Sequence, residues 1–422
     1  MRRFSSFLRV CLPLTRWKSD TTEVLKEELG RLTRRVEAIE DSKAVQALVS
    51  FYSSRPVHKL NSFDEVIHYC SRPDYNAEVF CHVELPVLLS HIIKALDNLP
   101  CGLNAMPSVL LVKNTYLNSF KKLIECDFPG NSESIKHFRN VVSEIEKLHR
   151  KRDILVTMAM GLLELKELLL RHRQFLFKVR KIDTKTTFDY LLHEGLVEIT
   201  EPMDSFSLLM VHYNFLSRML INLDREADNK VGMVDLEIDL ERLVRNSVDD
   251  AKQICTDHYG DCPDVKFIIS KDAGLIKFAH MSSTISYIVL ELMKNAFRAT
   301  VEAHMERDLM GIINCENMPP VEVLVNMKEY AKHACICISD EGLGMTETQA
   351  NMAMTYAYTS VKRPLIQFCD DGESIRGDAV APLAGYGFGL PMSRVYARTF
   401  DGDLVMSTME GYGTRMYYYI KL

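Results

Sequence analysis

The 422-residue sequence lacks the patterns that mark several classes of protein. No run approaches the ~18 consecutive apolar residues of a membrane-spanning helix. Lys and Arg number 51 against 57 Asp and Glu, and a net charge of −6 leaves no electrostatic footprint for nucleic acid. The eleven cysteines are odd in number and irregularly spaced, and no pair of Cys-x-x-Cys motifs could hold zinc. They predict reduced structural thiols.

Three common nucleotide-binding signatures are also missing. No Gly-Lys-Ser or Gly-Lys-Thr exists for a P-loop, and the glycine-rich segment 385–391 has no apolar strand before it, as a dinucleotide-binding βαβ unit requires. The His-Arg-Asp loop and the Asp-Phe-Gly motif of the usual eukaryotic protein kinases are absent as well. Any nucleotide site in this chain must therefore be of another kind.

The amino-terminal end differs in composition from the rest. Residues 1–19 contain no acidic residue, and their basic residues are Arg2, Arg3, Arg9, Arg16 and Lys18. Together with its serines, this predicts a mitochondrial transit peptide over residues 1–20, although the short apolar run could also belong to a secretory signal. The interpretation of the cysteines as reduced thiols favours the mitochondrial matrix.

Hydrophobic periodicity divides the remaining chain in two. Its length and 47% hydrophobic content allow two or three domains with sizeable cores. Long helical patterns before a polar break at 225–235 predict a helix bundle over residues 21–228. Mixed helices and strands predict an α/β sandwich over residues 229–422, and an α+β protein overall. The expected elements are helices 22–53, 83–98, 106–127, 132–178, 205–224, 238–259, 283–305 and 389–399, strands 265–270, 321–328 and 334–340, and a hairpin at 403–421.

The most informative stretch is Glu-Leu-Met-Lys-Asn-Ala-Phe-Arg at 291–298. At about 100° per residue, a helix places Glu291, Lys294, Asn295 and Arg298 on one polar face, with an apolar stripe across from it. A carboxylate and an amide oxygen suit a hard cation such as Mg²⁺, and nearby cations suit the phosphates that accompany it. Taken alone, such a face is more often a solvated surface of mixed charge.

Two glycine motifs follow this helix. The strand 334–340 ends at Asp340, and Gly342 and Gly344 then form a turn whose backbone can approach a flat ligand. Further on, the motif Gly-Tyr-Gly-Phe-Gly-Leu at 385–390 opens a helix, whose free amide groups can hold an anion. Each motif alone is weak evidence.

The order of these motifs, closed by Gly413-Thr414, resembles the Bergerat ATP-binding fold of the GHKL superfamily, which includes histidine kinases, mismatch-repair ATPases and certain chaperones. Within it, segments 291–302 and 384–398 resemble the mitochondrial kinases of the pyruvate and branched-chain 2-oxoacid dehydrogenase complexes. Segments 84–100, 157–166 and 217–222 are similar to the helical domain of that family. The resemblance covers about residues 45–422.

The resemblance implies a role for each motif residue. Glu291 would be the general base with Lys294 beside it, and Asn295 would bind Mg²⁺ and the nucleotide. Asp340 would accept a hydrogen bond from the adenine amino group, with Thr414 near the adenine. The other implied ATP-binding positions are Arg298, Gly342, Gly344, Gly385, Gly387, Gly389 and Leu390. In that family K⁺ assists nucleotide binding, and the sequence leaves its use here open.

Residues 346–384 join the two glycine motifs. So long a connection is either a lid or a disordered insertion. Because it lies between two motifs that would flank a nucleotide, we favour a lid that orders over the phosphates.

The resemblance also implies partners. The expected activity is a serine kinase that phosphorylates and inactivates the thiamine-dependent decarboxylase subunit of a 2-oxoacid dehydrogenase complex. The kinase would be a homodimer that docks on the lipoyl-bearing domain of the acyltransferase core. The candidate slot for the lipoyl arm could equally be buried core, and its residues are Phe51, Phe63, Val66 and Ile67.

Several departures from the family pattern leave the target open. Tyr287 stands where pyruvate dehydrogenase kinases usually carry His, which is nearer the branched-chain pattern, whereas segments 400–404 and 409–414 favour the pyruvate type. Pyruvate dehydrogenase is the favoured target, with the branched-chain complex as the alternative. The chain ends at Leu422 without the usual extended tail, so the dimer geometry is also open.

Two further function classes stay open. A GHKL ATPase that drives conformational change would carry additional dimerisation domains, which this sequence lacks. A non-catalytic regulator that uses the bundle for binding would not need the intact pair of Glu291 and Asn295.

Overall fold

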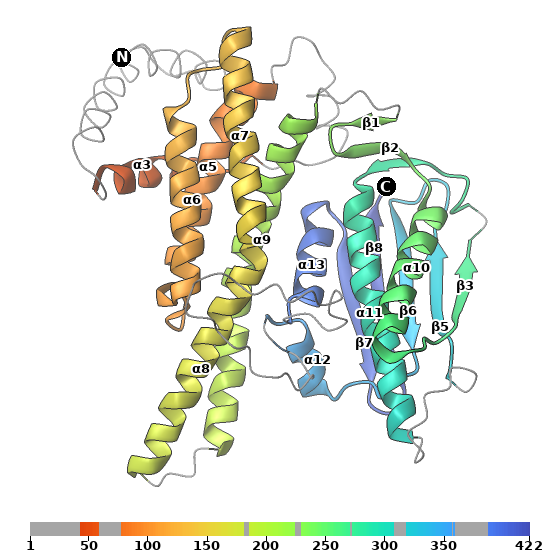
Figure 1. Cartoon of the computed structure of the whole chain (residues 1–422). Coiled ribbons are helices and arrows are strands. Elements are labelled where there is room, and N and C mark those ends of the chain that lie inside the picture. The colour runs from red at the N-terminus through yellow and green to blue at the C-terminus, as the bar shows by residue number, and fades with distance from the viewer. Residues whose placement is uncertain are drawn as a thin grey trace. The chain divides into compact units, whose positions relative to one another are not determined.

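The computed structural model describes residues 43–58, 77–180, 185–223, 229–270, 272–307, 318–356, 358 and 387–422, with the side chains of 169–196 left aside. The chain forms two compact units (Figure 1). The helical unit comprises Met1–Thr184 and Glu201–Met233, and the sheet unit comprises Lys185–Thr200 and Val234–Leu422. The predicted transit peptide lies outside the described residues.

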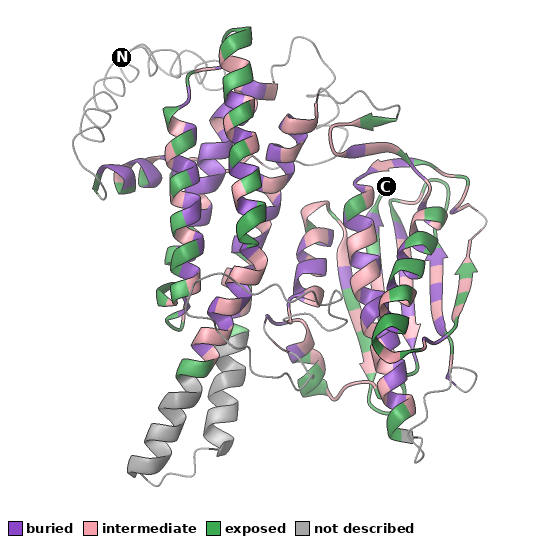
Figure 2. Ribbon diagram, in the orientation of Figure 1, coloured by how far each residue is buried: buried purple, intermediate pink, exposed green. Residues whose placement is uncertain are grey.

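The helical unit consists of amphipathic helices that bury their apolar faces on one another (Figure 2). In α6, for example, Val109, Val112, Tyr116 and Phe120 recur at helical spacing and are buried. The described helices are α3 (Lys43–Ser53), α5 (Ala77–Asp97), α6 (Pro107–Glu125), α7 (Ser132–Arg152), α8 (Ile154–Arg180) and α9 (Lys185–Asn222), whose first part, Lys185–Thr200, is grouped with the sheet unit. A 3-10 turn η1 (Leu103–Ala105) and a short strand β1 (Lys230–Val231) complete the unit's described elements.

Several of the predicted helices of this unit differ in extent from the observed ones: α5 begins at Ala77 and not at 83, and residues 22–42 of the predicted helix 22–53 lie outside the described residues. Residues 132–178 do not form one helix, because Asp153 adopts a left-handed backbone (φ 44, ψ 72) that ends α7 before α8 begins. The apolar period continues across Asp153 and conceals this break. The predicted helix 205–224 is the last part of α9, which continues through Pro202, and Met203 and Phe206 after the proline are fully buried.

The helix α5 has the length and apolar composition of a membrane span, although no such run is expected from the sequence. However, 67% of that stretch is buried inside the protein, including Leu85, Leu88 and Ile92. It also contains the buried Glu84. These features indicate the core helix of a bundle.

The sheet unit holds a five-stranded sheet of order β3-β5-β6-β8-β7, in which only the β3–β5 pair is parallel. Strand β2 pairs antiparallel with β4 beside it. The elements are β2 (Val234–Ile238), α10 (Leu240–Tyr259), β3 (Val265–Ile269), β4 (Phe278–His280), α11 (Ser282–Arg307), β5 (Val321–Asn326), β6 (His333–Asp340), α12 (Glu347–Ala353), α13 (Gly389–Thr399), β7 (Asp403–Met409) and β8 (Gly413–Lys421).

One face of this sheet is covered by α10, α11 and α13 (Figure 1). The core between them includes Val248 of α10, Ile288 and Leu292 of α11, and Ile336 and Tyr418 of the sheet. The antiparallel register places Asp340, the last residue of β6, opposite Thr414 near the start of β8. The fold thus brings two sequence motifs to one edge of the sheet.

The α+β architecture agrees with the prediction, whereas β2, β4 and α12 are not predicted. The three residues of β4 are too few to show alternation between apolar and polar side chains, and β2 begins within the polar break at 225–235, where no element is expected from the sequence. The helix α12 begins at a capping box formed by Thr346 and Gln349, and it occupies the first part of the proposed lid. Residues 357 and 359–384 of that lid lie outside the described residues.

Candidate active site

Glu291 and Lys294 lie together on α11. The Lys294 Nζ donates to Glu291 Oε1 at 2.6 Å, and the Lys294 and Glu291 side chains are only 10% and 15% exposed, respectively. Such shielding distinguishes this pair from an ordinary surface ion pair, because few waters can replace either partner. The structure therefore brings the two predicted catalytic residues into direct contact.

Asn295 and Arg298 share this face of α11 but differ in their surroundings. The half-buried Asn295 side chain has no hydrogen bond with any described residue, so its amide oxygen can receive a ligand. Arg298 instead turns toward Glu302, with Nε 3.8 Å from Oε1. That Nε is buried and has no hydrogen-bond partner among the described residues. The predicted contact of Arg298 with ATP stays a prediction.

Asp340 is a buried carboxylate held by two backbone groups. Its Oδ1 accepts from the Gly342 N–H at 3.0 Å and from the Thr414 N–H at 3.2 Å. Burial raises the pKa of Asp340 to about 6, although the two N–H donors act against that rise. The second oxygen, Oδ2, accepts no hydrogen bond from the described residues and can bind an amino group.

The glycines around Asp340 are required by close packing. A Cβ on Gly342 would lie 2.9 Å from the Ala299 Cβ and from Asp340 Oδ1. Gly344 has φ +65, and a Cβ there would lie 1.9 Å from the Met409 carbonyl. Gly413 has φ +120, and a Cβ there would lie 2.1 Å from the Asp340 carbonyl oxygen. The absence of side chains lets three segments meet beside the carboxylate.

The second glycine motif opens α13. Gly387 has a left-handed backbone (φ +74), and Gly389 is the first residue of the helix, with Leu390 packed partly on the core. A Cβ on Gly389 would lie 2.5 Å from Glu291 Oε2, so α13 begins against the predicted general base. Gly385 lies outside the described residues.

Sequence reasoning missed one aromatic pair at this site. Tyr287, one turn before Glu291, packs edge-on against Tyr396 of α13 with ring centroids 5.2 Å apart. Burial, with the nearby Glu291 and Tyr396, raises the pKa of the Tyr287 hydroxyl, which stays protonated. Tyr396 follows Gly389 by seven residues, which is two helical turns and places both on one face of α13. This spacing was the only sequence signal that Tyr396 lies near the site.

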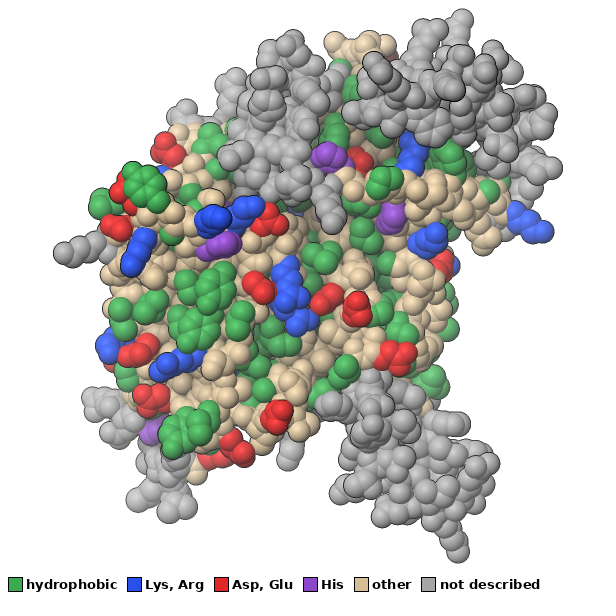
Figure 3. Space-filling model, turned by 180° about the vertical axis from the view of Figure 1, so that it is seen from behind, with side chains coloured by type: hydrophobic (Ala, Val, Ile, Leu, Met, Phe, Trp, Pro, Cys, Tyr) green, Lys and Arg blue, Asp and Glu red, His purple; other side chains and the backbone are tan. Residues whose placement is uncertain are grey.

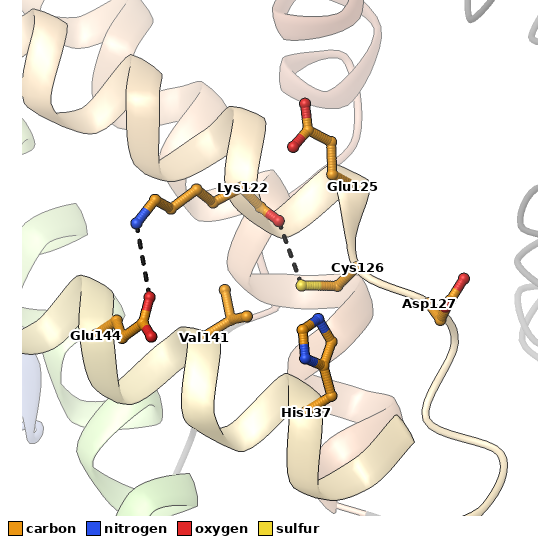
Figure 4. A pocket seen from close by; sticks show the side chains of 7 residues that line it. All are labelled: Lys122, Glu125, Cys126, Asp127, His137, Val141 and Glu144. Atoms are coloured by element: carbon orange, nitrogen blue, oxygen red, sulfur yellow. Dashed lines mark hydrogen bonds and ion pairs between the residues drawn. The ribbon is translucent and has the colours of Figure 1, made fainter. Parts of the chain in front are cut away.

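A surface pocket in the helical unit contains none of the predicted residues. It lies between the end of α6 and α7 and is lined by Lys122, Glu125, Cys126, Asp127, His137, Val141 and Glu144 (Figure 4). Its polar groups largely satisfy one another: Lys122 lies 3.7 Å from Glu144, and the Cys126 thiol donates to the Lys122 carbonyl. All the described cysteines are free, in agreement with the prediction of reduced thiols.

The residues near Glu291 and Asp340 fit a nucleotide with Mg²⁺. Asn295 offers a hard oxygen without a described competitor, and Asp340 offers Oδ2. Among the described residues, no group of three or more His, Cys, Asp and Glu side chains could hold a metal alone. A cation at Asn295 would therefore take most of its ligands from phosphates and water.

Two family models match this chain. A family model described as mitochondrial branched-chain alpha-ketoacid dehydrogenase kinase matches residues 58–235. A second, described as histidine kinase-, DNA gyrase B-, and HSP90-like ATPase, matches residues 280–422 and thus contains the whole candidate site.

Similar proteins include three mitochondrial pyruvate dehydrogenase (acetyl-transferring) kinases. Isozyme 4 of Mus musculus is 30% identical over 384 residues, covering 89% of this chain and 82% of the relative. The kinase of Ascaris suum is 31% identical over 81% of this chain and 77% of its own length. The kinase of Arabidopsis thaliana is 29% identical over 81% of this chain and 83% of its own length. With such identity over both units, the chain belongs to the mitochondrial 2-oxoacid dehydrogenase kinases, a family of ATP-dependent protein serine kinases with a GHKL ATP-binding domain.

Proposed function

We propose that this kinase phosphorylates a serine of the thiamine-dependent decarboxylase subunit of a 2-oxoacid dehydrogenase complex and thereby inactivates it. The observation that carries the proposal is the Glu291 carboxylate, which has Oε1 on Lys294 and Oε2 facing the start of α13. A base in this position lies on the same face of α11 as Asn295 and next to the glycine motif at the start of α13, where the phosphates would be held.

The remaining residues divide the work of binding. Asp340 Oδ2 accepts from the adenine amino group, and Thr414 lies beside it through its own N–H bond to Asp340. The backbone amides of Gly385, Gly387, Gly389 and Leu390 hold the phosphates. Mg²⁺, when bound at Asn295, neutralises charge that develops on the phosphates. The family resemblance alone suggests that K⁺ assists nucleotide binding as an accessory cation.

Pyruvate dehydrogenase is the favoured target, because the pyruvate dehydrogenase kinases named above cover both units of the chain. The branched-chain complex is the second candidate. It is favoured by Tyr287 at the position usually occupied by His, and by the description of the model that matches residues 58–235.

We propose a homodimer formed through the uncovered face of the sheet. Side chains that are neighbours in the strand register form an apolar row across all five strands: Ile268, Leu324, Cys337, Tyr417 and Val405. Ile268 and Val405 at its two ends are 42% and 44% exposed. Figure 3 shows hydrophobic side chains gathered on this side of the molecule with charged groups around them. A second copy of the same face would bury the row.

Val405→Lys tests the dimer, because it places a charge on the edge strand without touching the core. Sedimentation should show a shift from dimer to monomer, whereas Lys421→Ala on the neighbouring strand should leave the dimer intact. An unchanged sedimentation coefficient for Val405→Lys would assign the interface to another surface.

Docking on a lipoyl-bearing domain is also proposed, by the helical unit. Of the candidate slot only Phe51 is described; it is half-buried, and the Arg55 guanidinium lies 5.1 Å from its ring centroid. Phe63, Val66 and Ile67 lie outside the described residues. The kinase should bind a lipoylated domain and lose that binding when the lipoyl group is absent. Equal binding to both forms would favour direct recognition of the decarboxylase.

Glu291→Gln tests the catalytic assignment. The full chain is incubated with labelled ATP and with each of the two purified complexes. Gln keeps the shape but not the proton acceptor, so transfer should fall about 10²–10⁴-fold while ATP binding stays nearly intact. Glu237→Gln, on the exposed side of β2, is the control and should transfer normally. Transfer retained within tenfold would remove Glu291 from the mechanism, and the preferred complex identifies the target.

A further inference from the structure

Gly389, the first residue of α13, lies directly against the Glu291 side chain. A Cβ built at this glycine would meet Glu291 Oε2 at 2.5 Å, Cδ at 3.5 Å and Cγ at 3.9 Å. These are its three nearest atoms, so the space that a side chain would take is already used by Glu291 alone. Either the helix or the carboxylate would have to move to admit a methyl group.

The Glu291 carboxylate cannot move away from position 389 without breaking its ion pair with Lys294. Its other oxygen is held by the Lys294 Nζ at 2.6 Å, and the Glu291 side chain is only 15% exposed. On the preceding turn, the half-buried Tyr287 packs against Tyr396 of α13. Rotation of Glu291 away from position 389 would therefore separate the ion pair in a place where little water can replace it.

The backbone does not require glycine at this position. Gly389 is not among the residues with positive φ, and it lies in the first turn of an eleven-residue helix. Alanine has a higher helix propensity than glycine and restricts the unfolded chain more. On backbone grounds alone, alanine would be the more stable choice at position 389.

We propose that Gly389 is a positioning residue for Glu291, in addition to the amide that it offers to the phosphates. This inference rests on the proposed role of Glu291 as general base. The glycine keeps Oε2 in line with the start of α13 and leaves room beside it for the serine hydroxyl. During transfer, Oε2 takes the hydroxyl proton, the serine oxygen bonds to the γ-phosphorus, and the bond from that phosphorus to the bridging oxygen of ADP breaks.

A double-mutant cycle on the full chain tests the contact by thermal unfolding. Gly389→Ala should lower the melting temperature by on the order of 5 °C when Glu291 is present. In a Glu291→Ala background the same change should raise it by about 1–2 °C, because the collision is gone and the helix propensity remains. Gly342→Ala is the matched control: its Cβ would meet Ala299 and Asp340, so its effect should not depend on residue 291.

Kinetics separate positioning from a merely structural role. Gly389→Ala should lower kcat about 10²-fold while the Kd of Mg-ATP changes less than about threefold. In a Glu291→Gln background, which keeps the shape, the melting-temperature penalty should persist but the further loss of kcat should disappear.

A penalty that is equal in the Glu291→Ala background, or a loss of ATP affinity as large as the loss of kcat, would overturn the proposal. Should Glu291→Gln alone transfer phosphate normally, the general-base assignment falls. The sign reversal in melting temperature would still report the contact itself, so the two failures are distinguishable.

Discussion

Glu146 in the helical unit and Asp340 in the sheet unit are both carboxylates with 8% of their surface exposed, yet their pKa values shift in opposite directions. Burial raises the pKa of both. At Glu146 it is outweighed by Arg150 and Arg218, whose guanidinium nitrogens lie 2.7 and 3.0 Å from Oε1. The pKa of Glu146 is therefore lowered.

Asp340 has only neutral N–H donors, and burial prevails. At Glu84 of the helical unit burial also prevails and raises the pKa, although the His58 N–H donates to it at 2.8 Å and the charge of Arg55 acts against the rise. Only at Glu146, where two guanidinium groups bond directly to the carboxylate, is the effect of burial outweighed. Glu146 joins α7 to α9, whereas the proposed role of Asp340 in binding a ligand would come at a cost in stability.

The largest expected effect concerns Asn295. Asn295→Ala removes the uncommitted oxygen from the site, so Mg-ATP affinity should fall by about 100-fold or more while the melting temperature stays nearly unchanged. Titration calorimetry with and without Mg²⁺ measures this. Unchanged Mg-ATP affinity would move the metal to other ligands and weaken the contrast between the units.

Glu146→Ala should act on stability alone. The substitution leaves Arg150 and Arg218 without their shared acceptor. Because both arginines are partly exposed and water can hydrate them, the cost should be limited to about 2 kcal/mol of unfolding free energy at pH 7. Because the pKa of Glu146 is lowered by folding, its contribution is present above pH ~4.5 and is lost as the pH falls below that value. Urea unfolding measures it, with the exposed Glu144→Ala as a near-neutral control. Weakened ATP binding would contradict the assignment of Glu146 to structure.

Asp340→Asn should stabilise the protein and weaken ATP binding. The pKa of Asp340 is raised by folding, so the native state binds the proton more tightly, and its stability falls as the pH rises from about 4 through 6. Asn keeps an acceptor for Gly342 and Thr414 without the charge. At pH 8 the variant should gain on the order of 1–2 kcal/mol, and at pH 4 the gain should vanish.

Unfolding followed at both pH values tests this gain, and nucleotide titration should show reduced preference for ATP over GTP. A gain that is the same at pH 4 and pH 8 would mean that the carboxylate charge is not its cause.

The smallest effect is expected at Lys266, which pairs with Glu322 on exposed strands at 2.7 Å. With exposures of 59% and 41%, this pair should contribute less than about 0.5 kcal/mol, and Lys266→Ala should change neither ATP affinity nor pH dependence. A larger loss in urea unfolding would show that exposed pairs contribute more to this protein than burial suggests.

Much of the fold and most of the candidate site could be predicted because their signals are local. Helices α10 and α11 and strand β6 have unbroken periods, and the four polar residues of α11 lie within eight positions of one another. The short strands β2 and β4 could not be predicted, since their residues become a sheet only by pairing with each other. The break at Asp153 was missed because a single left-handed residue leaves the apolar pattern unchanged.

The sequence by itself determined which residues are candidates for the chemistry, because the carboxylate, amide and glycines stand in a recognisable order along the chain. Only the tertiary structure decided how they meet. Thr414 reaches Asp340 across 74 positions of the chain, and Gly389 reaches Glu291 through the packing of α13 on α11. Such contacts depend on strand register and helix packing, which are set by the whole core and not by any local pattern.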